Sequence, residues 1–209
     1  MPRVLSINRT LLFPPDPETI RAAAGMIRRG GLVAFPTETV YGLGADATSG
    51  PAVARIFEAK GRPAEKPLIV HVADLEQVRA VTASFPEAAL ELVRCFWPGP
   101  LSLVLPRSAG LPSQVSAGRP TVAVRMPAHP VALSLIRAAG VPLAAPSANR
   151  SGRPSPTEAR HVLEELAGRI EAVLDGGACT VGVESTVLDL SGARPIILRP
   201  GAVTGAQLE

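Results

Sequence analysis

Short apolar runs alternate along this chain with segments whose apolar residues recur at helical spacing, and glycine or proline separates most of them. The helical segments are residues 18–29, 52–59, 75–81, 87–96 and 130–139, and the apolar runs are residues 32–35, 68–72, 101–105, 122–125 and 143–145. Strands that alternate with helices pair mainly in parallel and are covered by helices on both faces. The alternation therefore predicts an α/β fold.

The last part of the chain adds an antiparallel feature. Residues 185–190 and 195–198 are strand-like, and the turn at residues 191–194 between them predicts a hairpin, hence a mixed sheet. No repeat or linker interrupts the sequence, so we expect one domain over residues 1–209, with its core at residues 18–204 and no second domain.

A further helix is predicted after residue 155. Ser155, Pro156 and Glu158 have the pattern of a helix start, with Ser155 as the N-cap and proline in the first turn. We expect this helix to run to about Ala167.

The composition, 46% hydrophobic and 19% charged, is typical of a folded globular protein. A formal charge of +3 favours anionic ligands but is too small to identify nucleic acid as the partner. Cys95 and Cys179 lie far apart and the histidines lack metal-binding spacing, so neither a disulfide framework nor a protein-built metal site is predicted. Without a membrane-spanning stretch or a signal sequence, we expect a cytoplasmic location and no membrane partner.

Two cations, Lys60 and Arg62, follow the helical segment 52–59 and stand beside Gly61 and Pro63. Cations at a helix end also stabilise the helix dipole, and such side chains are often simply solvated. The glycine and proline stiffen this loop, however. A fixed pair of cations suits phosphate recognition, with lysine as a point charge and arginine as a fork.

Two polar residues stand at the ends of apolar runs that we expect to be buried strands. Arg125 follows the segment that starts at Thr121, and a buried arginine needs either a carboxylate ligand or an internal Asp or Glu. The sequence leaves both partners open. His71 ends another apolar run, where a structural histidine is the more common outcome.

Small and polar residues are concentrated between positions 144 and 155. Small side chains such as Ala145 allow a ligand close to the backbone, and Ser147 and Asn149 offer donors and acceptors, although a simple turn is the alternative. Ser185 and Arg199 stand at the ends of the two final strands and are placed to complete one polar cleft.

The segment FPTETVYGLGAD at residues 35–46 lacks the third glycine of a dinucleotide-binding fingerprint. Its Thr37 and Thr39 either bond to the local backbone or act as ligand donors, and spacing does not decide between these. The sequence contains no GxSxG, SxxK or GxxxxGK[ST] motif, so neither covalent acyl chemistry nor a P-loop is supported.

Taken together, several segments resemble the YrdC-like family, the L-threonylcarbamoyladenylate synthases. They are FPTETVYGLG, KGRPAEKPLIVHV, FWPGPLSLVL, TVAVRMPAHP, PLAAPSANRSGRPSPT, GVESTVLDL and ILRPGAVT, in order from about Gly30 to Thr204. The Lys-x-Arg and Ser-x-Asn signatures of that family appear as Lys60/Arg62 and Ser147/Asn149.

The resemblance implies a twisted open mixed sheet with helices packed on it and a large basic cavity. It also implies synthesis of threonylcarbamoyl-AMP from L-threonine, bicarbonate or CO2, and ATP that carries Mg2+, with release of pyrophosphate. A partner transferase would then modify tRNA. Longer family members have a second domain after the RPG segment, and the sequence does not say whether this chain is short or truncated.

Carried over position by position, the resemblance implies two adjoining sites. The threonine site comprises Thr37, His71, Arg125, Ala145 and Ser185. The ATP site comprises Lys60, Arg62, Thr121, Ser147, Asn149, Ser155 and Arg199, with Lys60 and Arg62 as the catalytic pair. No protein metal ligand is implied. Arg125 is expected to bind the threonine carboxylate, so Arg125→Ala should weaken threonine binding before it affects folding.

Two other functions are weighed against this one. A module that binds tRNA or double-stranded RNA without catalysis fits a basic sheet, but an aromatic content of 3% leaves few stacking platforms. A related carbamoyl-adenylate step, as in hydrogenase maturation proteins, lacks its expected accessory motifs.

Overall fold

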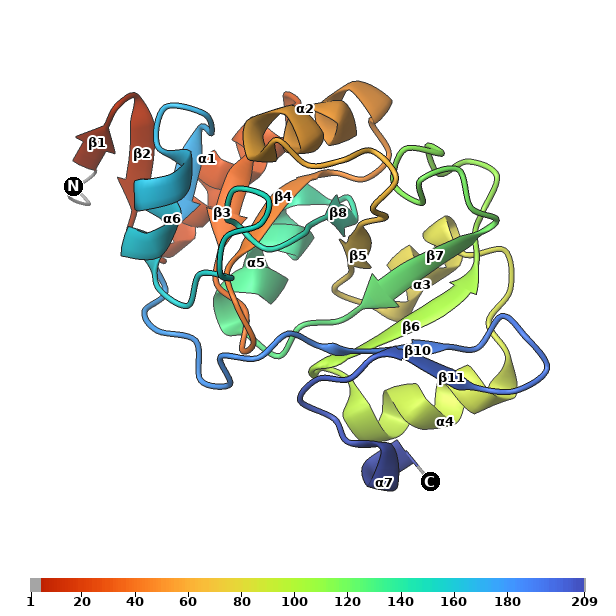
Figure 1. Cartoon of the computed structure of the whole chain (residues 1–209). Helices are drawn as coiled ribbons and strands as arrows, with labels where there is room; N and C mark the ends of the chain where they lie inside the picture. The colour runs from red at the N-terminus through yellow and green to blue at the C-terminus, as the bar shows by residue number, and fades with distance from the viewer. Residues whose placement is uncertain (1–4, 209) are drawn as a thin grey trace.

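The computed structural model describes residues 5–208, whose strands form one open mixed sheet (Figure 1). Within those residues the sheet has eleven strands in the order β1-β2-β9-β3-β4-β8-β5-β7-β6-β10-β11. Their bounds are β1 Leu5–Ile7, β2 Thr10–Phe13, β3 Val33–Phe35, β4 Gly42–Asp46, β5 Ile69–His71, β6 Leu101–Pro106, β7 Thr121–Arg125, β8 Leu143–Ala144, β9 Ala172–Leu174, β10 Thr186–Asp189 and β11 Ile196–Arg199. The predicted α/β fold with an open mixed sheet is confirmed.

Helices cover both faces of the sheet. They are α1 Pro17–Arg28, α2 Gly50–Lys60, α3 Leu75–Val81, α4 Glu87–Phe96, α5 Pro130–Ala139, α6 Ala159–Leu166 and α7 Gly205–Leu208. On one face α1 and α5 bury Val33 and Phe35 of β3, whereas Ala34 joins α2, α3, α4 and α6 in the core on the other face. Successive side chains of a strand point to opposite faces, which explains why this strand is apolar throughout.

The strand pairing brings the ends of strands that are far apart in the sequence to one edge of the sheet. Parallel strands β5 and β7 place His71 opposite Arg125. Strand β6 runs antiparallel to β7 and parallel to β10, with Thr186 opposite Leu101. The start of β10 therefore lies at the same edge of the sheet as the end of β7. The predicted β10–β11 hairpin is confirmed and contains a register shift after Val187.

One predicted boundary is wrong, because α6 begins at Ala159 with Glu158 as its N-cap instead of Ser155. The Ser155 hydroxyl donates to the Glu184 carboxylate at 2.8 Å. The carbonyl of Pro156 accepts from the backbone N–H of Tyr41 at 2.8 Å. These tertiary contacts hold the segment outside the helix.

Strands β1, β2, β4 and β9 and helix α7 were not predicted. Strand β4 contains Gly42 and Gly44, which have low strand propensity, and β9 spans only Ala172–Leu174. Both are held by partners on each side, since β4 pairs with β3 and β8, and β9 pairs with β2 and β3. Among residues 5–208, no helix is both long and apolar enough to cross a bilayer.

Candidate functional site

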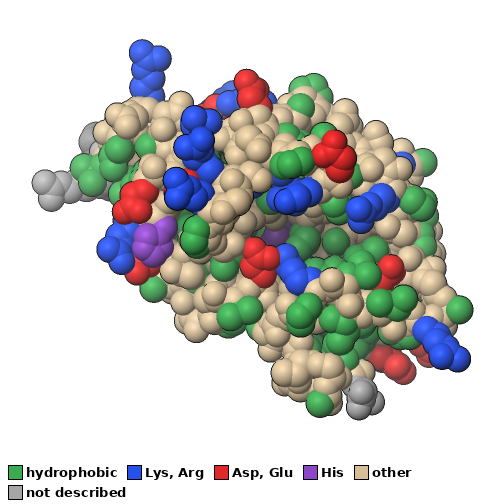
Figure 2. Space-filling model, viewed as in Figure 1, with side chains coloured by type: hydrophobic (Ala, Val, Ile, Leu, Met, Phe, Trp, Pro, Cys, Tyr) green, Lys and Arg blue, Asp and Glu red, His purple; other side chains and the backbone are tan. Residues whose placement is uncertain are grey.

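A cavity of about 580 Å³ opens where the ends of β5 and β7 meet the turn between β3 and β4 and the segments near residues 145–147 and 184–187. Figure 2 shows a hollow with Lys and Arg side chains around it and apolar side chains inside. The charged side chains in the wall are Arg62, Arg119, Arg125, Arg199, Glu184 and Asp189. Arginines outnumber carboxylates in this lining, so the cavity favours anionic ligands.

Most of the residues predicted for the two sites line this cavity. Those in the wall are Thr37, Arg62, His71, Thr121, Arg125, Ala145, Ser147, Ser185 and Arg199. Lys60, Asn149 and Ser155 are not part of the wall. Lys60 and Ser155 instead bond to residues that are, namely Ser147 and Glu184.

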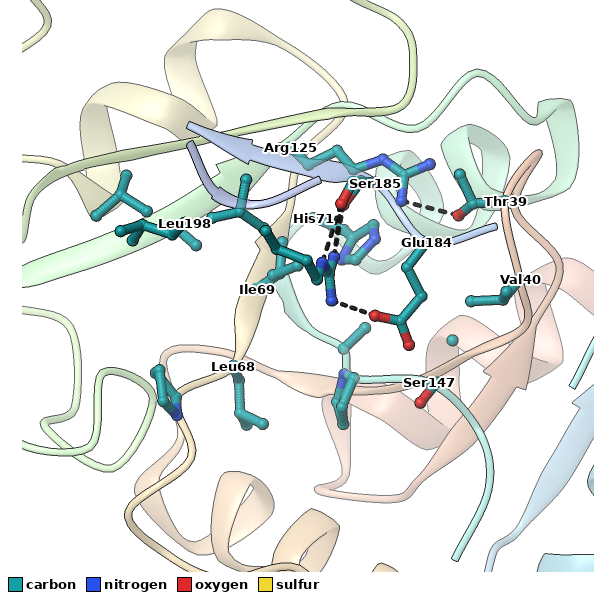
Figure 3. Close-up of a pocket in the computed structure, with 18 of the residues that line it drawn as sticks. Thr39, Val40, Leu68, Ile69, His71, Arg125, Ser147, Glu184, Ser185 and Leu198 are labelled. Carbon is teal, nitrogen blue, oxygen red and sulfur yellow. Dashed lines mark hydrogen bonds and ion pairs between the residues drawn. The ribbon is translucent and has the colours of Figure 1, made fainter. Parts of the chain in front are cut away.

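Arg125 is buried at the end of β7, and its guanidinium contacts three protein groups, of which Figure 3 shows Thr39. Its Nε donates to the Gly99 carbonyl at 3.1 Å, and Nη1 donates to Thr39 Oγ1 at 3.0 Å. Its Nη2 lies 2.6 Å from Glu38 Oε1. A guanidinium has more N–H donors than these contacts use, so Arg125 retains capacity to bind a carboxylate.

Glu38 is the internal carboxylate that the sequence had left open as a partner for Arg125. Its Oε2 accepts from the backbone N–H of Ala128 at 3.0 Å. Its Oε1 forms a close ion pair with Arg125 Nη2 without the alignment of a hydrogen bond. Both side chains are largely buried, so each charge compensates the other where solvent screens it little.

His71 lies beside Arg125 and is also buried. Burial, reinforced by the Arg125 charge, lowers the pKa of His71 to about 3. The imidazole is therefore neutral near pH 7. Its Nδ1 has no hydrogen-bond partner within residues 5–208, and its ring meets the ring of Phe35 edge to face, with centroids 6.0 Å apart. A neutral histidine in the cavity wall is available to a ligand.

The turn between β3 and β4 is held together by the Thr37 hydroxyl. It donates to the Val40 carbonyl at 2.6 Å and accepts from the backbone N–H groups of Thr39 and Val40, each at 3.2 Å. Thr37 and Thr39 also share a hydrogen bond of 2.9 Å between their hydroxyls. The structure thus shows the local bonding that the sequence left open. It orients the turn that brings Glu38 and Thr39 to Arg125.

Lys60 is the last residue of α2, because Gly61 adopts a left-handed conformation with φ of 58°. The buried Nζ donates to the Ser147 carbonyl at 2.5 Å and to the Asn149 carbonyl, with Asn149 Oδ1 at 3.4 Å. Burial, with a contribution from the Arg62 charge, lowers the pKa of Lys60 to about 7. Lys60 therefore holds the loop that carries Ser147.

Arg62 lines the cavity two residues further along the chain. Its Nη2 donates to the Pro67 carbonyl at 3.0 Å and its Nε donates to the Lys66 carbonyl at 3.3 Å. These bonds within its own loop fix the direction of the guanidinium, as the glycine and proline content of the loop predicts.

Arg199 at the end of β11 is hydrogen-bonded to Ser185, the residue before β10. It donates to the Ser185 carbonyl from Nε at 3.0 Å and from Nη2 at 2.9 Å, and Nη2 also donates to Ser185 Oγ at 3.0 Å. Its Nη1 pairs with the Glu184 carboxylate. Gly201 lies against this backbone, since a Cβ there would overlap the Glu184 carbonyl oxygen.

Comparison with known proteins places this arrangement in a family. A family model for Sua5, YciO and YrdC proteins, described as telomere recombination, matches residues 25–201. The chain belongs to the Sua5/YciO/YrdC family.

Relatives within the Sua5/YciO/YrdC family are close in sequence and structure. The threonylcarbamoyl-AMP synthase of Pyrococcus abyssi is 57% identical over 190 residues, and the synthase of the same name from Bacillus subtilis is 54% identical over 195 residues. The crystal structure of P. abyssi Sua5 complexed with L-threonine superposes with a TM-score of 0.92 at 55% identity, covering 93% of this chain and 58% of that one. The two curated matches cover 91% and 93% of this chain but 56% of each relative, so the chain spans little more than half their length.

For this member of the Sua5/YciO/YrdC family, sequence reasoning missed several charged residues of the site. Glu38 and Glu184 directly adjoin the predicted residues Thr37 and Ser185, and this adjacency is the signal that could have found them. Arg119 and Asp189 gave no comparable signal. Among the described residues, no group of three or more His, Cys, Asp or Glu side chains is arranged to hold a metal ion.

Proposed function

We propose that this chain synthesises L-threonylcarbamoyl-AMP from L-threonine, bicarbonate or CO2, and ATP. The observation that carries the proposal is the net basic cavity, in which a buried arginine with spare donors shares the wall with other arginines and with hydroxyl side chains. Relatives named for this activity, one of them solved with L-threonine, support it.

Threonine is assigned to the part of the cavity around Arg125. The guanidinium binds the amino acid carboxylate through the N–H groups that Thr39, Gly99 and Glu38 leave free. Neutral His71 and the Ser185 hydroxyl supply polar contacts. The remaining predicted members of this site are Thr37, which orders the adjoining turn, and Ala145, which leaves space for the substrate.

ATP is assigned to the side of the cavity lined by Arg62, Arg199, Thr121 and Ser147. Arginine forks and hydroxyl groups in the wall bind phosphate and ribose oxygens directly. Lys60, Asn149 and Ser155, which lie outside the wall, act through the loops that they hold. Mg2+ enters with the triphosphate as part of the substrate complex.

The chemistry joins two anions. The threonine amine nitrogen attacks the carbon of CO2 and loses a proton, which gives an N-carboxylate. A carboxylate oxygen then attacks the α-phosphorus of ATP, and the bond to the bridging oxygen breaks as pyrophosphate leaves. Arg62 and Arg199, with Lys60 nearby, position the reactants and reduce charge repulsion, so no protein nucleophile is required. The assignment of Lys60 and Arg62 as the catalytic pair stays a prediction.

The product is a reactive mixed anhydride, which suits transfer to a second enzyme. We propose that a partner transferase receives it and modifies tRNA, in the cytoplasm. The alternative of an RNA-binding module without catalysis is not favoured by relatives that are named as synthases.

The test is incubation of the protein with ATP, Mg2+, bicarbonate and L-threonine. We expect pyrophosphate and threonylcarbamoyl-AMP to appear together and only when threonine is present, as measured by a coupled pyrophosphate assay and mass spectrometry. Absence of product, combined with tight salt-sensitive binding of RNA, would contradict the proposal and support the RNA-binding alternative.

A further inference from the structure

Glu184 is a carboxylate that lies among the cations and hydroxyls of the candidate ATP site (Figure 3). Its Oε1 accepts from Ser155 Oγ at 2.8 Å, and its Oε2 pairs with Arg199 Nη1. The side chain lines the cavity and is 36% exposed. The proposed reaction assigns no role to this negative charge.

The charge of Glu184 also reaches the two cations of the Lys-x-Arg pair. Burial lowers the pKa of Lys60 and of Arg62, and the Glu184 carboxylate opposes this change at both residues by favouring their charged forms. A single carboxylate thus compensates Arg199 by contact and Lys60 and Arg62 through space.

The other carboxylate of the wall, Asp189, is engaged differently. Its Oδ1 accepts from the backbone N–H and the hydroxyl of Ser191 at 2.8 and 2.7 Å, within the turn of the β10–β11 hairpin. No ion pair in the described part of the chain includes Asp189. Asp189 is therefore a suitable comparison for Glu184. Both carboxylates line the cavity, but only Glu184 contacts side chains that are predicted to bind ATP.

We propose that Glu184 is an internal substitute for a nucleotide phosphate, holding the position on Arg199 that phosphate oxygens take when ATP binds. The inference rests on the proposed function. Carboxylate and phosphate oxygens accept the same charge-assisted hydrogen bonds, and two anions repel each other at one guanidinium. ATP binding therefore moves the half-exposed Glu184 side chain toward solvent. Part of the binding energy of ATP is used to displace it.

The test compares wild-type protein with Glu184→Gln, which keeps the size and the hydrogen-bonding groups but removes the charge. Each is titrated with ATP in the absence of threonine and bicarbonate, with and without Mg2+, by isothermal titration calorimetry. We expect the variant to bind ATP more tightly by up to about fivefold, the upper end of the range for a partly exposed ion pair. The difference should shrink at high salt because screening weakens the competing pair.

Asp189→Asn is the control, since it removes an equal charge from the same wall and is expected to change ATP affinity less. Equal affinity in Glu184→Gln and wild type, or weaker binding by Glu184→Gln, would overturn this inference alone. Weaker ATP binding by Glu184→Gln in the titration with Mg2+ alone would also overturn the inference, because it would show that Glu184 supports the metal-bound nucleotide. Failure of the wild-type protein to bind ATP would overturn the proposed function together with the inference.

Discussion

Arg125 satisfies at once the two demands that the sequence had left as alternatives. It has an internal carboxylate partner, Glu38, and it lines the cavity with more N–H donors than its protein contacts use. The internal pair explains how an arginine remains charged while only 3% exposed. It also changes what a substitution at this position should do, because removal of the guanidinium leaves Glu38 buried without its partner.

Arg125→Ala is expected to weaken threonine binding about tenfold or more, because the carboxylate loses a charged donor. It should also lower the free energy of unfolding by about 3 kcal/mol, because Glu38 is left as an unpaired buried charge. This prediction differs from the expectation drawn from the sequence that binding is lost before folding is affected, because the buried partner Glu38 is now known. Calorimetry with threonine and urea unfolding measure the two effects.

The double variant Arg125→Ala/Glu38→Gln separates binding from stability. It should recover most of the lost stability, because the unpaired charge is removed, without recovering threonine affinity. Normal threonine affinity in the double variant would contradict the assigned role of Arg125. Undiminished stability in Arg125→Ala would contradict the importance of the pair.

The first residues of α1 and α6 show how far a local sequence pattern determines where a helix begins. At α1, the Asp16 carboxylate accepts from the backbone N–H groups of Glu18 and Thr19, each at 2.9 Å, and Pro17 follows in the first turn. At α6 the same kind of pattern predicts an N-cap at Ser155, yet the N-cap is Glu158 and the helix begins at Ala159. Tertiary bonds to Glu184 and Tyr41 outweigh the weak local preference at that place.

Asp16→Ala should therefore lower the free energy of unfolding, because the first turn of α1 loses its N-cap. Ser155→Ala in the ligand-free protein should cost less, since it removes a bond to a partly exposed carboxylate and no helix cap. Urea unfolding followed by circular dichroism compares the two. An equal or larger loss in Ser155→Ala would argue that residue 155 supports α6 after all.

Across the whole molecule, the two apolar cores lie on opposite faces of one sheet, and the cavity contains polar groups that are buried in the folded state. Buried titratable groups link the stability of the entire fold to pH. The expectation of a single domain over residues 1–209 stays a prediction.

His71 should make the fold sensitive to acid. The unfolded chain binds a proton at the ordinary histidine pKa of 6.5, whereas the folded protein resists protonation of His71 down to about 3. Between these values the unfolded state holds more protons, so the free energy of unfolding should fall as the pH falls from 6.5 toward 3. This group contributes up to about 1.4 kcal/mol per pH unit.

The measurement is urea unfolding at several pH values between 4 and 7 for wild type and His71→Asn. The variant should show a shallower dependence on pH, because the titrating carboxylates are common to both proteins. His129→Asn, at a half-buried position where burial also lowers the histidine pKa, should flatten the dependence less. Identical slopes for wild type and His71→Asn would show that His71 is not the source of acid sensitivity.

The sequence by itself determined the alternation of strands and helices and the closing hairpin, and most of the site residues that it predicted do line the cavity. These features depend on local properties, namely hydrophobic periodicity, glycine and proline positions and short motifs. They can be recognised in the sequence without a structure. Only the tertiary structure decided that Glu38 pairs with Arg125, that Lys60 binds the carbonyls of Ser147 and Asn149, and that Ser155 meets Glu184. Each of these contacts joins residues far apart in the chain. The strand order decides which of them lie close in space, and a buried charge is stable only beside a group that compensates it.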